Sequence, residues 1–84
     1  MTRLLFFGRL RDVAGASEQN IELPSDIATI ADLRRWLGAE NDVLGEALNA
    51  RSVRVAVDRL IASDDCVLVR GAAEVAFMPP LSGG

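Results

Sequence analysis

The residues most able to do chemistry lie at the end of the sequence, which finishes Met78-Pro-Pro-Leu-Ser-Gly-Gly84. Neither proline can donate an N–H to a neighbouring strand, so the pair predicts an extended spacer. The six residues 79–84 can then reach roughly 20 Å at about 3.3 Å each. Gly83 and Gly84 have no side chains and can enter a channel too narrow for other residues. The segment therefore predicts a tail that presents its α-carboxylate to another protein.

That carboxylate has an ordinary pKa of about 3.5, so at neutral pH it is ionised and a poor electrophile. It becomes reactive if another enzyme converts it to a mixed anhydride with AMP. A sulfur donor can then displace AMP and leave a terminal thiocarboxylate, whose sulfur is a good nucleophile. The alternative interpretation is a frayed chain end with incidental glycines. The strand pattern and the Pro-Pro spacer that precede the glycines favour the interpretation that the tail carries sulfur.

Composition excludes most catalytic sites within the chain itself. There is no histidine, and all nine basic residues are arginines. A Ser-His-Asp or Cys-His arrangement is therefore absent, and so is a P-loop, which requires lysine. The single cysteine, Cys66, cannot form an internal disulfide, and we expect it to be a small buried hydrophobe. We expect no metal and no bound cofactor, with ATP used only by an activating partner.

Charge and hydropathy limit the partners. A net charge of −3 argues against nucleic acid, because phosphate binding requires a surplus of basic residues. No apolar run approaches the roughly 20 residues that span a bilayer. The apolar start of the chain is interrupted too soon, by Arg9 and Arg11, to be a signal peptide. These observations predict a cytoplasmic protein without a membrane partner.

Hydrophobic patterning predicts one domain over residues 1–78, followed by the tail 79–84. Thr29 and Asp32 form a capping-box pattern at the start of a helix with apolar residues at 30, 33 and 37, and Gly38 is expected to end it. Asp42 is expected to cap a second, shorter helix. Residues 8–16 are expected to be a polar connection between two strands. The strands are predicted at 2–7, 17–23, 53–57, 60–62 and 74–78.

The first and last of these strands are apolar on both faces. Leu4 and Phe6 alternate with Leu5 and Phe7, and the last strand shows the same pattern. Such strands suit the centre of a mixed sheet, side by side and parallel. One face would pack on the helix, and neighbouring structure or another protein would cover the other. This order predicts an α+β, β-grasp (ubiquitin-like) fold, with a mixed sheet of four to five strands, one main helix and a short second helix.

The sequence resembles the small subunit of molybdopterin synthase, the MoaD family of β-grasp sulfur carriers. The resemblance covers the whole chain and is strongest in residues 5–15 and 74–84, with a shorter match at 55–58. The chain departs from the family pattern at three places. Met78 stands where the family often has phenylalanine, and Asp58 replaces the common asparagine. Gly71-Ala-Ala-Glu74 is one residue longer than the usual Gly-Asp-Glu.

The resemblance implies that an E1-like adenylyltransferase adenylylates Gly84, which then carries sulfur as a thiocarboxylate, while Gly83 gives access to it. The tail would insert into the large subunit, within a heterotetramer of two small and two large subunits. There it would donate sulfur to a pterin precursor, forming molybdopterin in molybdenum cofactor biosynthesis. The residues that would line the tunnel are Pro79, Pro80, Leu81 and Ser82. The residues that would contact the large subunit, and alternately the activating enzyme, are Phe7, Ile61 and Met78.

Two alternatives remain at this stage. The same carrier chemistry could serve another pathway, such as thiamine or cysteine synthesis or tRNA thiolation. A ubiquitin-like binding module without tail chemistry is the other alternative, and for such a module the free Gly-Gly end would be a coincidence. Carriers and binding modules differ in whether the terminus gains sulfur. The pathways differ in which large subunit captures the chain.

Overall fold

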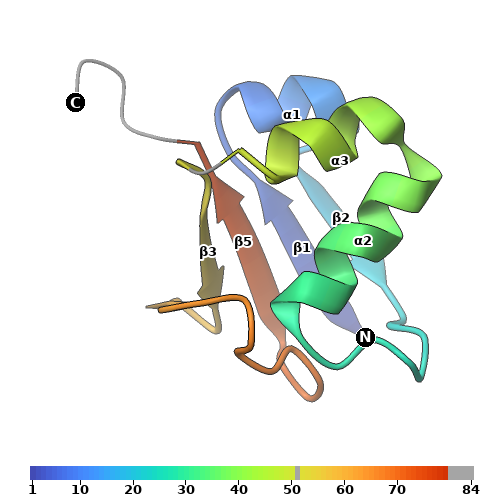
Figure 1. Cartoon of the computed structure of the whole chain (residues 1–84), viewed down its shortest axis with the longest axis vertical. Coiled ribbons are helices and arrows are strands. Elements are labelled where there is room, and N and C mark those ends of the chain that lie inside the picture. Colours follow the sequence, from blue (N-terminus) through green and yellow to red (C-terminus); the bar gives the residue numbers. More distant parts are fainter. Residues whose placement is uncertain (51, 80–84) are drawn as a thin grey trace.

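The computed structural model describes residues 1–50 and 52–79 (Figure 1). The five strands and three helices of this part follow in the order β1 (Thr2–Phe6), α1 (Arg9–Ala14), β2 (Glu18–Ile21), α2 (Ile30–Glu40), α3 (Asp42–Leu48), β3 (Arg54–Val57), β4 (Leu60–Ile61) and β5 (Glu74–Met78). The strands form one sheet in the order β2-β1-β5-β3-β4. Helix α2 crosses one face of the sheet, and α1 and α3 lie beside each other near one end (Figure 1).

The two strands that are apolar on both faces lie at the centre of the sheet, as predicted. β1 and β5 are parallel, with a register that pairs Leu4 with Val75 and Phe6 with Phe77. β2 pairs antiparallel with β1, and β3 pairs antiparallel with β5. A mixed sheet with central parallel strands and helices on one face is the β-grasp arrangement. The predicted α+β fold class is therefore confirmed.

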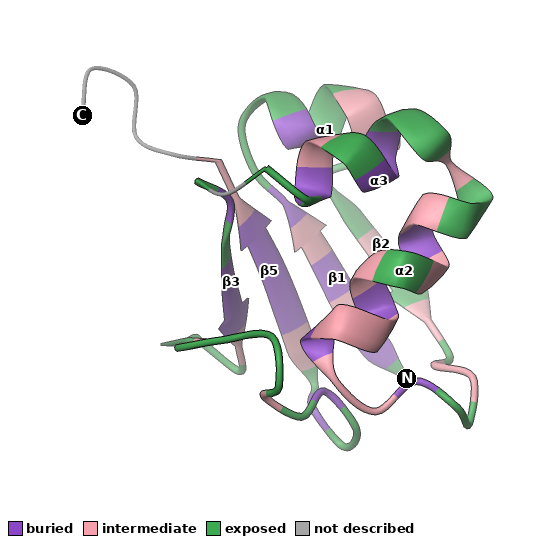
Figure 2. Cartoon of the chain, viewed as in Figure 1, coloured by how far each residue is buried: buried purple, intermediate pink, exposed green. Residues whose placement is uncertain are grey.

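The hydrophobic core lies between the sheet and the helices. One face of the central strands supplies two stacked aromatic rings, those of Phe6 and Phe77, whose centroids are 5.6 Å apart with an interplanar angle of 10°. Such a pair contributes beyond its buried area. In Figure 2 the buried residues run along β1 and β5 and along the inner side of α2. The main helical contributors to this core are Ile30, Leu33, Leu37, Leu44 and Leu48.

Helix α2 begins with the predicted capping box. The Thr29 Oγ1 accepts a hydrogen bond from the Asp32 N–H at 3.3 Å, and the Thr29 N–H donates to Asp32 Oδ2 at 3.1 Å. The Ala28 N–H donates to the same carboxylate oxygen at 3.0 Å. These donors, Ala28 first and Thr29 second, hold the pKa of Asp32 below its ordinary value of 3.8, although partial burial opposes them.

The capping carboxylate makes stability depend on pH. Because the pKa of Asp32 is lowered in the folded state, its contribution is present above 3.8 and is lost as the pH falls through the folded-state value. We expect Asp32→Asn to be less stable than the natural chain in urea unfolding at pH 7. The difference should shrink progressively below about pH 4. A difference that stays constant from pH 7 to pH 3 would contradict this role of the charge.

The segment after β1 is a short helix rather than the polar connection we predicted. α1 lies between two glycines with positive φ, Gly8 at 56° and Gly15 at 82°. Leu10 is buried, and Val13 and Ala14 pack against the core. This i, i+3, i+4 spacing is the helical signal that the polar residues of the segment obscured. The hairpin therefore contains a helix at its turn.

The boundary between α2 and α3 also differs from the prediction. Gly38 does not end α2, which continues to Glu40, and Asn41 rather than Asp42 caps α3. The Asn41 Oδ1 accepts a hydrogen bond from the Leu44 N–H at 3.1 Å. Gly38 instead allows a close helix–helix contact, because a Cβ at Gly45 would lie 2.5 Å from the Gly38 Cα. Both glycines are thus required for packing between the helices.

Replacing Gly45 with alanine is expected to destabilise the fold by about 1–3 kcal/mol, because the new methyl group meets backbone that cannot move away easily. In an ordinary helix interior the same change stabilises by about 1 kcal/mol. Gly38→Ala is the matched comparison and should cost less, since its Cβ would lie 3.2 Å from the Gly45 Cα. Denaturant unfolding measures both. A stabilised Gly45→Ala protein would contradict the close contact.

Cys66 is exposed, so the prediction of a buried cysteine is wrong. The Asp64 Oδ1 accepts a hydrogen bond from the Cys66 N–H at 2.8 Å, which folds this segment into a turn. Of the apolar run that starts at Cys66, only Val69 is fully buried. The turn at Asp64 therefore leaves Cys66 at the surface, and the apolar run reaches the core only at Val69.

Candidate functional site

The predicted tail begins where β5 ends. Met78 is the last strand residue and Pro79 follows it, and both are partly buried. Beyond Phe6, the Phe7 N–H still donates to the Phe77 carbonyl at 3.1 Å, so pairing continues to the tail's root. The other tail residues, Pro80, Leu81, Ser82, Gly83 and Gly84, lie outside the described residues. Their predicted roles remain predictions.

The face of the sheet opposite the helices carries an apolar surface beside this root. Register places Leu5, Ala76, Ala56 and Ile61 in one row across β1, β5, β3 and β4. Residues at alternate positions, such as Phe6 and Phe77, point to the core instead. We call this surface the open sheet face and define it by Leu5, Phe7, Ile61 and Met78, together with the buried Ala56 and Ala76 that lie between them.

The three predicted contact residues all belong to the open sheet face. Phe7 is 47% exposed and Ile61 is 57% exposed, while Met78 is partly buried. Met78 lies two residues after Ala76 in β5, so the two side chains point to the same face of the sheet. The structure therefore brings Phe7, Ile61 and Met78 to one side of the sheet. Exposed aromatic and branched side chains gathered on one surface are typical of a protein–protein contact.

Charged residues border the open sheet face. The Arg3 Nη2 lies 2.8 Å from Glu74 Oε2 on the neighbouring strand. This pair lies two residues along the strands from the pair of Leu5 and Ala76, on the same face. Arg54 is exposed opposite Met78, close to where the tail begins. Sequence reasoning did not single out Arg54. The alternation within 53–57 already placed it on the face opposite Val55.

Two departures from the family pattern, Asp58 and the segment 71–74, lie at the end of this surface that is farther from the tail. Asp58 and Arg59 have positive φ values of 49° and 72°, as a tight turn between antiparallel strands requires. The Asp58 Oδ1 accepts hydrogen bonds from the N–H groups of Ala73 and Glu74, at 2.9 and 3.0 Å. The carboxylate thus anchors the start of β5. Glu74 keeps an ion pair with Arg3 despite the altered loop that precedes it.

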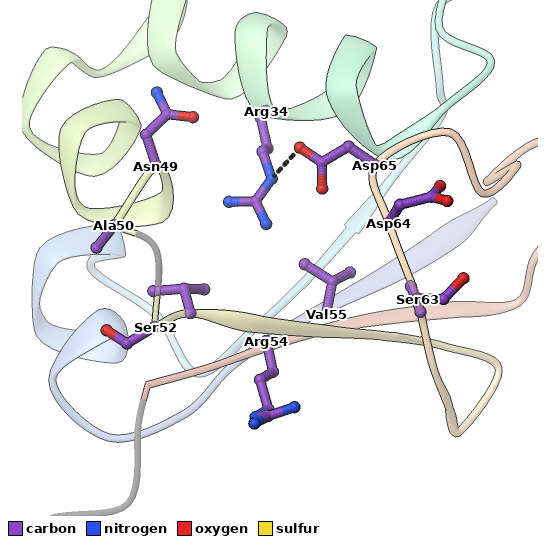
Figure 3. Close-up of a pocket in the computed structure, with 11 residues that line it drawn as sticks. Arg34, Asn49, Ala50, Ser52, Arg54, Val55, Ser63, Asp64 and Asp65 are labelled. Atoms are coloured by element: carbon purple, nitrogen blue, oxygen red, sulfur yellow. Dashed lines mark ion pairs between the residues drawn. The ribbon is translucent and has the colours of Figure 1, made fainter.

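A second candidate site is a cavity of about 410 Å³ between α2, the end of α3, β3 and the loop around Asp65 (Figure 3). Arg34 points into it, with its Nε 3.1 Å from Asp65 Oδ2. Its Nη1 donates to the Leu48 carbonyl at the end of α3. Arg54 points to the other side of β3 (Figure 3). The guanidinium of Arg34 therefore already joins a helix end to a loop.

Neither a metal site nor a membrane-spanning segment occurs in the described ranges 1–50 and 52–79. These residues contain no group of three or more histidine, cysteine, aspartate or glutamate side chains that could hold a metal ion. None of their helices is long and apolar enough to cross a bilayer.

Comparison with known proteins identifies the family. A model of the ThiS family matches residues 4–84. The chain belongs to this family. It is also 34% identical over 84 residues, all of both chains, to the molybdopterin synthase sulfur carrier subunit of Escherichia coli strain K12. The predicted resemblance to that family of carriers is confirmed.

Solved structures agree with the fold. The putative molybdopterin converting factor, subunit 1, from Pyrococcus furiosus aligns with a TM-score of 0.72 and 29% identity, over 95% of this chain and 97% of that one. SAMP1 from Haloferax volcanii aligns with a TM-score of 0.79 and 22% identity, over 99% and 98% of the two chains. This second likeness concerns the fold alone.

Proposed function

We propose that the protein is the sulfur carrier subunit of a molybdopterin synthase in molybdenum cofactor biosynthesis. The observation that carries the proposal is full-length similarity to proteins of that name, over every residue of both chains in the Escherichia coli case. The open sheet face beside the root of the tail adds independent support, because a carrier must dock while its end reaches elsewhere.

The proposed chemistry takes place on the carboxylate of Gly84. An E1-like adenylyltransferase would join this carboxylate to AMP from ATP, with release of pyrophosphate. A sulfur donor would then displace AMP and leave a thiocarboxylate. In the large subunit the sulfur would bond to a carbon of the pterin precursor and displace an oxygen substituent from that carbon, and water would then cleave the acyl–sulfur bond and restore the carboxylate. On this proposal, catalytic residues are supplied by the partners.

The open sheet face would dock on both partners in turn. Phe7, Ile61 and Met78 provide the apolar contact, and Pro79 carries the chain away from the sheet. A single surface shared by two partners means that the carrier must leave one before it binds the other. Two carriers would flank two large subunits. The proposed location of the cycle is the cytoplasm, where the first partner has access to ATP.

Reconstitution tests the pathway. The chain would be incubated with the activating enzyme, ATP and a sulfur donor, and then supplied with a molybdopterin synthase large subunit and the pterin precursor. We expect the two subunits to co-elute and molybdopterin to form. A matched reaction would replace the large subunit with a thiamine-pathway acceptor. Sulfur transfer in that reaction, together with failure to bind the large subunit, would assign the chain to another pathway.

A further inference from the structure

Gly8 and Pro79 approach each other more closely than a side chain at residue 8 would allow. A Cβ added to Gly8 would lie 2.8 Å from the Pro79 Cγ, 3.6 Å from its Cδ and 4.0 Å from its Cβ. The Pro79 ring therefore occupies the space that a side chain at residue 8 would fill. The two residues are far apart in sequence but meet where the tail leaves the sheet.

The backbone conformation of Gly8, with φ at 56° and ψ at −137°, already favours glycine, and the nearby proline adds a second reason. Gly8, Gly15 and Gly71 all have positive φ, at 56°, 82° and 80°. A Cβ at Gly15 or Gly71 would meet nothing within 4 Å, whereas one at Gly8 would meet the proline. Gly8 thus meets two requirements, a positive φ and a close approach.

The backbone around Gly8 is held on both sides, so the proline is the partner that would have to move. The Phe7 N–H donates to the Phe77 carbonyl at 3.1 Å, and the Arg11 N–H donates to the Gly8 carbonyl at 3.2 Å. Leu10 is buried in the core. Pro79, in contrast, borders a cavity of about 240 Å³, so its ring can shift without opening the core.

A shift of Pro79 would be amplified along the tail. The ring fixes φ near −65°, so Pro79 sets the direction in which the following residues start. The chain end lies up to roughly 15–20 Å further on, and a misplacement of about 1 Å at a reacting group can cost on the order of 100-fold in rate. The position of the ring therefore bears on where Gly84 arrives.

We propose that Gly8 is a positioning residue for sulfur transfer: its missing side chain seats Pro79 and thereby sets the path on which the tail enters its partners. The inference rests on the proposed function, since the path matters only if Gly84 must reach a partner's active site. It assigns to the glycine that follows the first strand a role in the reaction as well as in the turn.

The test compares Gly8→Ala with Gly15→Ala. Both changes place alanine at a positive φ beside α1, at a ψ of −137° for residue 8 and 5° for residue 15, and only Gly8→Ala meets Pro79. Comparison in a Pro79→Ala background separates the effect of the ring from that of the different ψ. We expect sulfur transfer to slow about 10- to 100-fold in Gly8→Ala relative to Gly15→Ala. The loss should fall on the maximal rate rather than on affinity for the large subunit. Equal rates for the two variants, with an active natural chain, would overturn the inference.

Removing the Pro79 ring provides a second test of the inference. Pro79→Ala deletes Cγ and Cδ, the two nearest atoms, so adding Gly8→Ala to it should cause little further loss. In parallel, amide chemical shifts of residues 81–84 should change in Gly8→Ala and stay unchanged in Gly15→Ala. A natural chain that transfers no sulfur would count against the proposed function, whereas the shifts separately test whether Gly8 seats Pro79, which is the structural basis of the inference. Unmoved tail signals in Gly8→Ala would overturn it.

Discussion

Deleting Gly84, or extending the chain by one alanine, is expected to reduce sulfur transfer by at least about 100-fold. One residue changes the reach of an extended tail by about 3.3–3.6 Å, which exceeds the tolerance of roughly 1 Å at a reacting group. An added alanine also places a methyl group where the proposed channel admits only glycine. The rate of molybdopterin formation in the reconstituted system measures the effect.

The control for both variants is that folding and docking persist. The core and the open sheet face are formed within the described residues 1–50 and 52–79. Thermal unfolding and complex formation with the large subunit should therefore match the natural chain. Retained sulfur transfer in either variant would contradict the carrier mechanism.

Ile61→Asp is expected to weaken binding to the large subunit by at least about 30-fold, or roughly 2 kcal/mol, because it would place an unpaired carboxylate within an apolar contact. The control is Leu60→Asp. Leu60 is the neighbouring residue of β4 and is more exposed, at 75%, but it pairs with Val57 and so faces the helix side. Titration calorimetry with the large subunit measures both affinities.

Both residues are exposed on an edge strand, so neither change should unfold the domain. We expect Leu60→Asp to bind within about two-fold of the natural chain, as is usual outside a contact surface. The same pair of variants should respond in the same way to the activating enzyme, because one face would serve both partners. Equal weakening by the two variants would contradict docking through the open sheet face.

The sequence predicted the sheet well because its pattern is unusual. Few strands are apolar on both faces, and two such strands at opposite ends of the chain suit parallel neighbours at the centre of a small sheet. β1 and β5 take those places. The capping box of Thr29 and Asp32 was also predicted correctly, because its hydrogen bonds are local.

The elements that the sequence misplaced depend on contacts between distant residues. Gly38 was expected to end α2, yet it lies inside the helix because Gly45 packs against it. The polar residues of α1 concealed a helix that Leu10 anchors in the core. Cys66 was assigned to the core from an apolar run, whereas the preceding Asp64 folds that segment into a turn.

Parts of the candidate site were likewise predictable from the sequence, and other parts were not. The spare apolar face was predicted from alternation alone, and the resemblance named Phe7, Ile61 and Met78 on it. The hydrogen bonds that hold the start of β5 were not predictable, since the Asp58 carboxylate accepts them from backbone groups fifteen and sixteen residues away. The contact between Gly8 and Pro79 joins the two ends of the domain, and neither residue type alone indicates it.

The most direct measurement of the carrier function is the intact mass of the chain after incubation with the activating enzyme, ATP and a sulfur donor. We expect the mass to rise by the exchange of one oxygen for one sulfur. Fragmentation should place the change at Gly84, and omission of ATP should prevent it. An unchanged mass, with an activating enzyme shown to be competent on another carrier, would contradict the account.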